Sequence, residues 1–386
     1  MDLLYRLVYG TACRSTHHKF AMDALKQLDP ELREPWLRAF LRHHQDYLRG
    51  AKDPDDRFRD FTNHVLHVGD NYWGGAIPTA EKWYGIALES LRQRQWSDAI
   101  HACGVLSHYV TDPVMPFHTA QSDRETVIHR ACEWSICKSY DAIHQITQLR
   151  VGMPDVPFTD DPDWLAQAIR FGAETGYRHY DDLIDHYDFR RGAKDPPAGL
   201  DPVCREVLAK LFGTSIRLWA GVLSRLLRES RVSPPIEDLT FPMLFAVLDA
   251  PKRMIVAKIA DAQDRELVRA MYDEWERTGK VVDNLPLDDR MVQEAYEREV
   301  LQDDTGRWRP LPEGGKPHIA ALARTAAATV RPSITPVMTE RTGPRRSPVE
   351  SPSPTAAASS GCPAMASTIC CWNRAIRRRC WRACAN

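Results

Sequence analysis

One stretch in the first half of the chain carries two pairs of side chains that could hold a metal ion. His108 and Asp112 are four residues apart, and His129 and Glu133 repeat that spacing. On a helix this spacing places both side chains of a pair on one face, one turn apart. Imidazole nitrogen and carboxylate oxygen are ligands that zinc takes in proteins. One pair alone is typical of a surface hydrogen bond, but two pairs with His118 between them favour a zinc site.

Further histidines and aspartates lie upstream of this stretch, in neighbouring sets. They are His17 and His18, then Asp53, Asp55 and Asp56 in RGAKDPDD, then His64 and His67 in FTNHVLH. Each set also has a simpler interpretation, as a polar helix start, a solvated acidic turn or exposed imidazoles. Residue type alone therefore leaves open which of them bind metal.

Amphipathic helices are expected to position these side chains. Apolar residues recur at helical spacing over 16–28, 36–48 and 83–91, and helices also fit 97–111, 124–147, 161–187 and 201–228. Regular β alternation is scarce. The pattern predicts an all-α, multi-helix domain over 13–228, a linker over 229–240 and a smaller helical extension over 241–310. Residues 311–386, rich in Pro, Ser, Thr and Ala over 331–360, are predicted to be a disordered tail.

The composition argues against several classes of protein. Among the 386 residues, 51 Lys and Arg face 52 Asp and Glu, so the net charge of -1 gives no global attraction to nucleic acid. No run approaches the ~18 uninterrupted apolar residues of a membrane helix, so no transmembrane segment is predicted. Residues 1–13 form a poor secretory signal, and the five cysteines before residue 205 lack regular spacing. A cytoplasmic location with reduced thiols is therefore favoured over secretion.

The order of these motifs resembles the zinc-dependent phospholipase C family. The chain shows a His, then GAKDPD, then Asn-His, H-x3-D, Pro-Phe-His and H-x3-E. That family includes the bacterial phosphatidylcholine-preferring phospholipases C, and it is related to the S1/P1 nucleases and to the catalytic part of glycosylphosphatidylinositol-specific phospholipase D. The likeness covers about residues 13–228. It implies an all-α fold of the phospholipase C/P1 nuclease type and hydrolysis of a phosphodiester, with release of a phosphorylated headgroup from a phospholipid.

The resemblance also implies a site for two to three zinc ions. It assigns Asp55, His64, His108 and Asp112 to one ion, His118, His129 and Glu133 to a second, and His17 with a bridging Asp112 to a third. The family's motifs favour Asp55 over Asp53, His64 over His67 and His17 over His18. Cys13 and His18 are candidates to complete the third site. Clustered zinc ions would neutralise phosphoryl oxygens and lower the pKa of water.

Further roles follow from the same resemblance. Asp55 is the candidate general base as well as a ligand, and Phe61 matches an aromatic residue of the family's headgroup pocket. Apart from the resemblance, Tyr72 and Trp73 in GDNYWGG, with Phe117, are candidate substrate-binding aromatic residues that line the cleft, and core packing is the alternative for each. Glu133, where the nuclease branch has Asp, favours the phospholipase branch. Asp56 stands where the choline-preferring enzymes have an aromatic residue, so a preference for choline is not supported.

Two alternatives from other classes remain. An S1/P1-type single-strand nuclease should show base-stacking aromatic residues and a secreted, disulfide-bonded chain. A non-catalytic, zinc-stabilised helical module would use residues 241–302 to bind a partner. The expected partners are a phospholipid or other phosphodiester and, transiently, a membrane surface, whereas nucleic acid is disfavoured.

Overall fold

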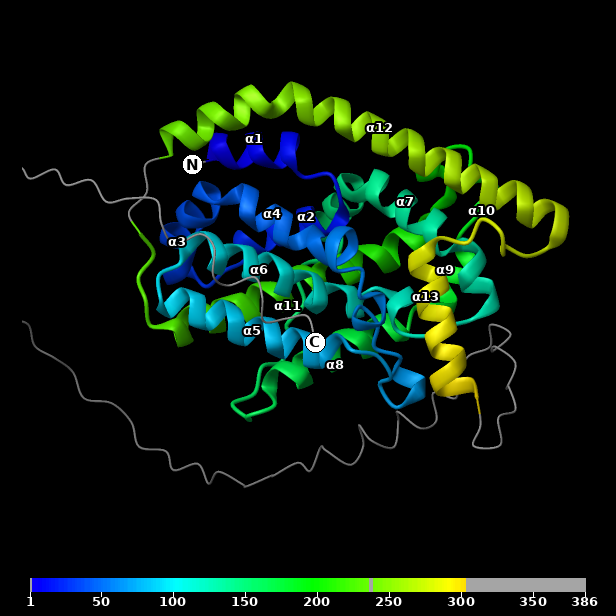
Figure 1. Ribbon diagram of the computed structural model, residues 1–386, viewed down its shortest axis with the longest axis horizontal. Coiled ribbons are helices and arrows are strands. Elements are labelled where there is room, and N and C mark those ends of the chain that lie inside the picture. Colours follow the sequence, from blue (N-terminus) through cyan, green and yellow to red (C-terminus); the bar gives the residue numbers. More distant parts are fainter. Residues whose placement is uncertain (1, 236–238, 303–386) are drawn as a thin grey trace, which may run out of the picture. The chain divides into compact units, whose positions relative to one another are not determined.

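The described chain is built of helices joined by short turns. The computed structural model describes residues 2–235 and 239–302, with helices along most of their length and no strand among them (Figure 1). Two isolated β-bridges join His67 to Trp73 and Tyr187 to Leu200. The prediction of an all-α fold is confirmed. The predicted tail over 311–386 lies outside the described residues.

Two helices form the centre of the fold. Helix α6 (Trp96–Thr111) is buried at almost every position after Asp98, and α11 (Pro202–Ser230) packs against α2, α5, α6, α7 and α8. Within the described part of the chain, α11 alone is long and apolar enough to cross a membrane. However, 83% of its most apolar window is buried inside the protein, as expected of a core helix.

The other helices of the first 230 residues surround this centre. They are α1 (Asp2–Ala12), α2 (Thr16–Leu25), α3 (Pro30–Arg42), α4 (His44–Asp53), α5 (Ala76–Arg92), α7 (Asp123–Ile146), α8 (Trp164–Tyr177), α9 (Tyr180–His186) and α10 (Phe189–Gly192). Short helical turns cover Pro54–Phe58, Phe61–Asn63, Val68–Asp70, Asp112–Val114, Pro116–His118, Thr147–Val151 and Pro196–Gly199. The single helices predicted over 36–48 and 161–187 are each two helices. The breaks fall at His43 and His179, whose ψ angles of 26° and 10° leave the helical region.

Helices α4 and α6 cross very closely, and this crossing brings their carboxyl ends together. A Cβ atom on Gly50 would lie 2.1 Å from the His101 carbonyl oxygen, and one on Gly104 would lie 2.2 Å from that of Tyr47. Only glycine at both positions allows the two backbones to approach this far. The turn that follows α4 is thereby held beside the end of α6.

The segment after α11 continues with α12 (Thr240–Thr278), α13 (Leu287–Tyr296) and a turn at Glu297–Leu301. Helix α12 packs against α1 and α7 (Figure 1), and Arg130 and Trp134 of α7 bond to Asp264 and Asp261 of α12 at 2.6 and 3.1 Å. Helix α13 packs against the turn Phe61–Asn63. The described residues all fall within one compact unit, Met1–Arg324. The division into a domain and an extension at 229–240 stays a prediction.

Candidate metal centre

A cavity of about 910 Å³ is lined by residues of α2, α7, α12 and α13 and of the turns after α4 and α6. Its wall contains all the side chains predicted to bind metal except His108, which is fully buried. Phe61 and Phe117 also line it. The structure therefore brings these predicted ligands together at a single cavity.

Each predicted ligand is held by a well-defined local structure. The Ser15 hydroxyl accepts from the His18 N–H and the Ser122 hydroxyl from the Glu125 N–H, which fixes the first turns of α2 and α7. His17 lies in that first turn of α2, while His129 and Glu133 share one face of α7. The remaining ligands occupy turns or helix ends: Asp55 in Pro54–Phe58, His64 after Phe61–Asn63, His108 and Asp112 at the end of α6, and His118 in Pro116–His118.

Asp112 lies at the centre of the first cluster and faces three histidines. Its Oδ2 atom is 3.0 Å from His108 Nε2 and 3.1 Å from His64 Nδ1. Its Oδ1 atom is 3.4 Å from His17 Nδ1. One buried carboxylate is therefore shared among imidazoles from three separate elements.

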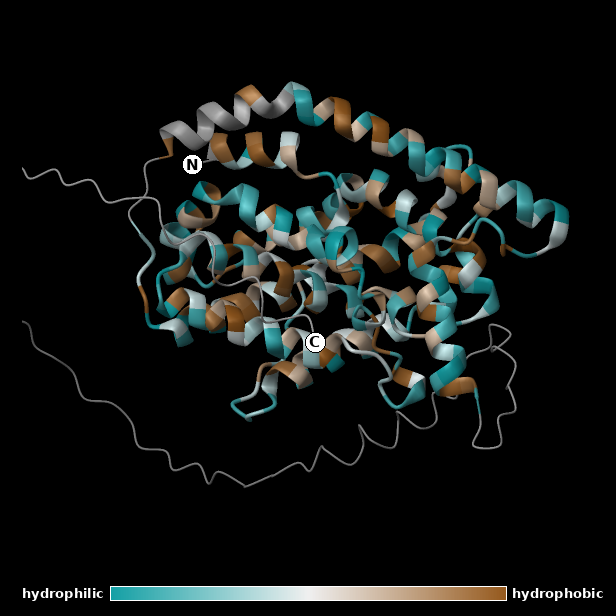
Figure 2. Ribbon diagram, in the orientation of Figure 1, coloured by the Kyte–Doolittle hydropathy of each residue, from teal (hydrophilic) through white to brown (hydrophobic). Residues whose placement is uncertain are grey.

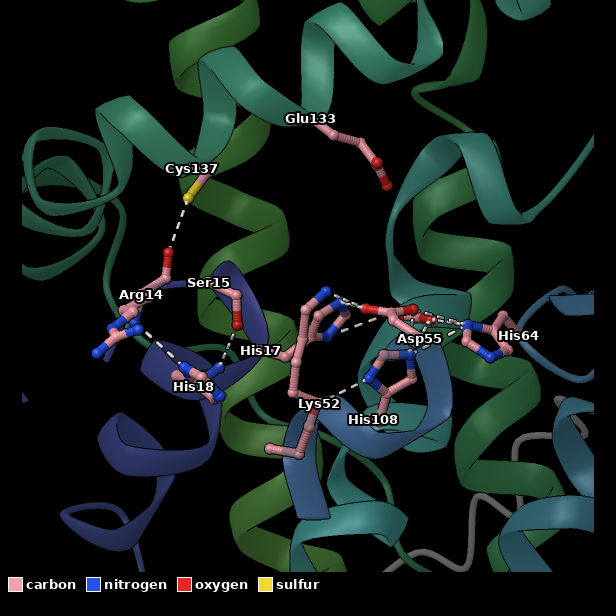
Figure 3. A network of polar contacts seen from close by, with 12 residues as sticks. Arg14, Ser15, His17, His18, Lys52, Asp55, His64, His108, Glu133 and Cys137 are labelled. Carbon is pink, nitrogen blue, oxygen red and sulfur yellow. Dashed lines mark hydrogen bonds and ion pairs between the residues drawn. The ribbon is translucent and has the colours of Figure 1, made fainter. Parts of the chain in front are cut away.

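Asp55 faces His64 and His108 as well (Figure 3). Its Oδ1 atom is 3.4 Å from His108 Nε2 and 3.6 Å from His64 Nδ1, and Lys52 forms a short ion pair with its Oδ2 atom. Burial alone would raise the pKa of Asp55, but Lys52 and His108 hold it well below its usual range. Although burial lowers the pKa of Lys52, Asp55 raises it to about 12. Asp55 is therefore ionised at neutral pH.

The hydrogen bonds of His108 show why this cluster suits a cation. His108 Nδ1 is 3.0 Å from the Ala51 carbonyl oxygen, which can only accept, so Nδ1 carries the hydrogen and Nε2 directs a lone pair into the cluster. There Nε2 meets His64 Nδ1 at 3.1 Å and the two carboxylates. Burial lowers the pKa of His108, but Asp112 and Asp55 raise it well above its usual value, so without a metal ion the Nε2 lone pair takes up a proton. A metal ion would satisfy the same lone pairs.

A second cluster consists of His129 and Glu133 of α7 and His118 of the turn Pro116–His118. Figure 3 shows Glu133 on its helix, apart from Asp55 and His64. Glu133 Oε1 lies 3.4 Å from His129 Nε2 and 3.6 Å from His118 Nε2. Burial would raise the pKa of Glu133, but the two histidines hold it well below its usual range. On its other side, His129 Nδ1 contacts Glu125 at 2.7 Å and Asp289 at 3.0 Å.

The described residues contain three groups of side chains that could each hold a metal ion, and within each group the ligand atoms lie within 4.8 Å of one another. They are His17, His108 and Asp112, then Asp55, His64 and His108, then His118, His129 and Glu133. His17 Nδ1, Asp112 Oδ1 and His129 Nε2 are buried in these groups without a hydrogen-bond partner, as expected of atoms that a cation would satisfy. Nitrogen and carboxylate donors at these positions fit zinc.

The sequence neighbours of the predicted ligands make other contacts. His18 Nδ1 accepts from the Arg14 N–H at 3.1 Å and turns away from the cluster (Figure 3). Asp53 lies 2.7 Å from His101, and His67 packs against Trp73 and Tyr296. Cys13 lines the cavity but belongs to none of the three groups.

Some of the predicted aromatic residues line the cavity and others do not. Phe61 lines the cavity, whereas Tyr72 and Trp73 do not. The Tyr72 hydroxyl donates to Glu174 at 2.6 Å and Trp73 Nε1 donates to Glu299 at 3.1 Å. These two side chains therefore form hydrogen bonds outside the cavity wall.

Two charged residues of the site were missed in the sequence. Lys52 precedes Asp55 by three residues, a spacing that signals an ion pair on a helix but does not reveal its place beside the ligands. Asp289 lies far along the chain, outside the segment that resembles the family, and no local pattern links it to His129.

Comparison with known proteins agrees with this geometry. The sequence model of the family described as zinc dependent phospholipase C matches residues 16–170. No curated protein matches the chain. The matched segment contains every residue of the three groups. Residues 16–170 of this chain are therefore similar to the zinc-dependent phospholipase C family.

Proposed function

We propose that this protein is a zinc-dependent phosphodiester hydrolase that releases a phosphorylated headgroup from phospholipids. The observation that carries the proposal is the pair of metal groups that share His108, with Asp112 of the first group also facing His64 of the second. A third group lines the same cavity, and all three lie in the segment that matches this family. The family implies a phospholipid as the substrate class. The three groups support two to three zinc ions.

The chain's own residues suit this chemistry. Bound zinc would supply positive charge to phosphoryl oxygens and activate water. Asp55 is ionised and lies among the imidazoles, so we assign it a second role as the general base that accepts a proton from the attacking water. Lys52 keeps Asp55 charged and, because it also lines the cavity, adds positive charge next to the phosphoryl group.

Helix α12 supports contact with a membrane surface. Hydrophobic and hydrophilic residues alternate along the ribbon of this helix (Figure 2). Helix α12 carries large apolar side chains that are 46–64% exposed, namely Leu248, Met254, Ile255, Val256 and Ile259. Lys252 and Lys258 are exposed beside them. Met254 and Val256 also line the cavity, so the apolar run borders the proposed catalytic site. Apolar residues mixed with lysines are typical of helices that lie in the interface of a bilayer.

This contact can be tested apart from catalysis. We expect the full chain to sediment with vesicles of phosphatidylcholine and phosphatidylglycerol. The double variant Ile255→Ser, Ile259→Ser should bind at least roughly tenfold more weakly, because full burial of an isoleucine side chain contributes ~1.5–3 kcal/mol and somewhat over half of each of these two side chains is exposed and free to enter the bilayer. Leu149→Ser is the matched control, since Leu149 is 74% exposed elsewhere. Equal binding of the double variant and wild type would contradict the assignment of α12.

The proposed activity is tested with a substrate panel. Zinc-loaded wild type and Asp53→Asn should release phosphorylated headgroups from phospholipids in mixed micelles, whereas Asp55→Asn should not. Asp53 is the matched control because it is a neighbouring buried aspartate outside the metal groups. Cleavage of single-stranded DNA alone would support the nuclease alternative, and zinc binding without any hydrolysis would support the non-catalytic module.

We also propose that the protein works in a reducing compartment such as the cytoplasm. The five cysteines of the described residues are all free, and Cys103, Cys132 and Cys204 are buried. Cell fractionation with an antibody to the chain would test this, and recovery of the protein outside the cells would contradict it.

A further inference from the structure

The second metal group is completed by a contact from a distant part of the chain. His129 belongs to this group through Nε2, which faces Glu133 and has no hydrogen-bond partner among the described residues. Its other ring nitrogen, Nδ1, lies 3.0 Å from Oδ1 of Asp289 on α13. Since a neutral imidazole that binds metal through Nε2 carries its hydrogen on Nδ1, that hydrogen must be accepted by a group on this side.

Helix α13 does not depend on His129 for its position. Val292 packs with Phe61 and Val65 in a small apolar cluster. The Tyr296 hydroxyl donates to Asp70 at 3.1 Å, and in the following turn Glu299 accepts from Trp73 Nε1 at 3.1 Å. Asp289 therefore lies beside His129 because these other contacts hold α13 in place.

Glu125 is the other carboxylate near Nδ1, at 2.7 Å, but it has further partners. Its Oε2 atom accepts from Gln121 Nε2 at 2.8 Å, and it lies on α7 one turn before His129. By contrast, Oδ2 of Asp289 is buried and has no hydrogen-bond partner in the described part of the chain. The ring of His129 is thus the group that Asp289 is placed to hold.

We infer that Asp289 is a positioning residue of the second metal group, which accepts the Nδ1 hydrogen of His129 and directs Nε2 to the metal ion. This inference rests on the proposed zinc binding. It assigns part of the metal centre to α13, outside the segment 16–170 that matches the family. A carboxylate in this position fixes the ring orientation and raises the basicity of the ligand nitrogen.

The test measures zinc affinity of the full chain by competition with a chromophoric chelator. Asp289→Ala and Asp289→Leu both remove the acceptor, and the leucine variant also keeps the space filled. We expect each to weaken one zinc ion per chain by about 10–100-fold, the range for loss of such a partner. Asp289→Asn keeps an acceptor oxygen and should recover most of the affinity. Asp288→Ala, on the same helix and also at the cavity, is the control and should bind zinc as wild type does.

Two further measurements separate this role from others. In a His129→Ala background, Asp289→Ala should weaken zinc binding no further, because both changes act through one ring. Full additivity of the two changes, or wild-type affinity in Asp289→Ala and Asp289→Leu, would overturn the inference. Failure of the proposed function would instead be seen in the phospholipid substrate panel, where the wild-type protein would bind zinc but hydrolyse no phosphodiester.

Discussion

Replacing Asp112 by asparagine should weaken zinc binding at two of the three metal groups. Asp112 contacts His17, His64 and His108, and it is only 1% exposed. Asparagine keeps the shape of the side chain but removes its charge. The change therefore perturbs metal binding more than packing.

The size of the effect follows from ligand sharing. A complete site of four ligands binds zinc with an apparent ~10–16 kcal/mol, or about 3 kcal/mol for each ligand. Loss of one ligand should thus weaken an ion by roughly 100-fold or more. Because Asp112 faces two of the three groups, we expect two ions to weaken by this amount.

The assay is zinc content after dialysis against a defined free zinc concentration, measured by atomic emission. Asp53→Asn is a close control, because Asp53 is 3% exposed and also faces a histidine, yet belongs to no metal group. We expect wild-type zinc in Asp53→Asn and a loss of up to two ions in Asp112→Asn. Unchanged zinc content and affinity in Asp112→Asn would refute the shared-ligand interpretation.

Two stability predictions concern the scaffold. Gly104→Ala should destabilise the protein by about 1–3 kcal/mol, because the added methyl group would force α4 and α6 apart. In Gly85→Ala the added methyl group meets no atom within 4 Å, so this change should stabilise the protein by ~0.5–1 kcal/mol. Chemical denaturation measures both changes, and equal effects would contradict the close crossing of the two helices. Glu274 accepts the backbone N–H groups of residues 282–284 at 2.8–2.9 Å; burial alone would raise its pKa, but these bonds lower it from 4.5 to about 2. The stability that Glu274 contributes is therefore present above pH 4.5 and is lost as the pH falls toward 2. Glu274→Gln should lower the free energy of unfolding by about 2 kcal/mol near neutral pH, and this difference should shrink between pH 4.5 and 2 in denaturation curves. A difference that does not change with pH would argue against this role of Glu274.

The sequence predicted the helices and the paired ligands because both depend on short-range spacing. His108 with Asp112, and His129 with Glu133, need only one turn of helix to share a face. The choice of Asp55 over Asp53 required the family resemblance, since two residues along a helix point in different directions and the spacing does not say which one faces inward.

The contacts that the sequence could not predict depend on backbone turns or on distant parts of the chain. Asn71 and Tyr72 both adopt positive φ angles, of 54° and 58°, in a tight turn before Trp73. The aromatic side chains that follow such a turn can face either way, and here they leave the cavity. Asp289 reaches His129 only through the packing of α13, which no local pattern encodes.

We have proposed that zinc in these groups drives phosphodiester hydrolysis. The most direct test is to strip the purified full chain of metal with a chelator, titrate zinc back and follow bound zinc and hydrolysis of a phospholipid panel together. We predict that the stripped protein is inactive and that hydrolysis returns as the groups fill, at two to three zinc ions per chain. Hydrolysis that survives complete metal removal, or a fully loaded protein that hydrolyses no phosphodiester, would contradict the claim.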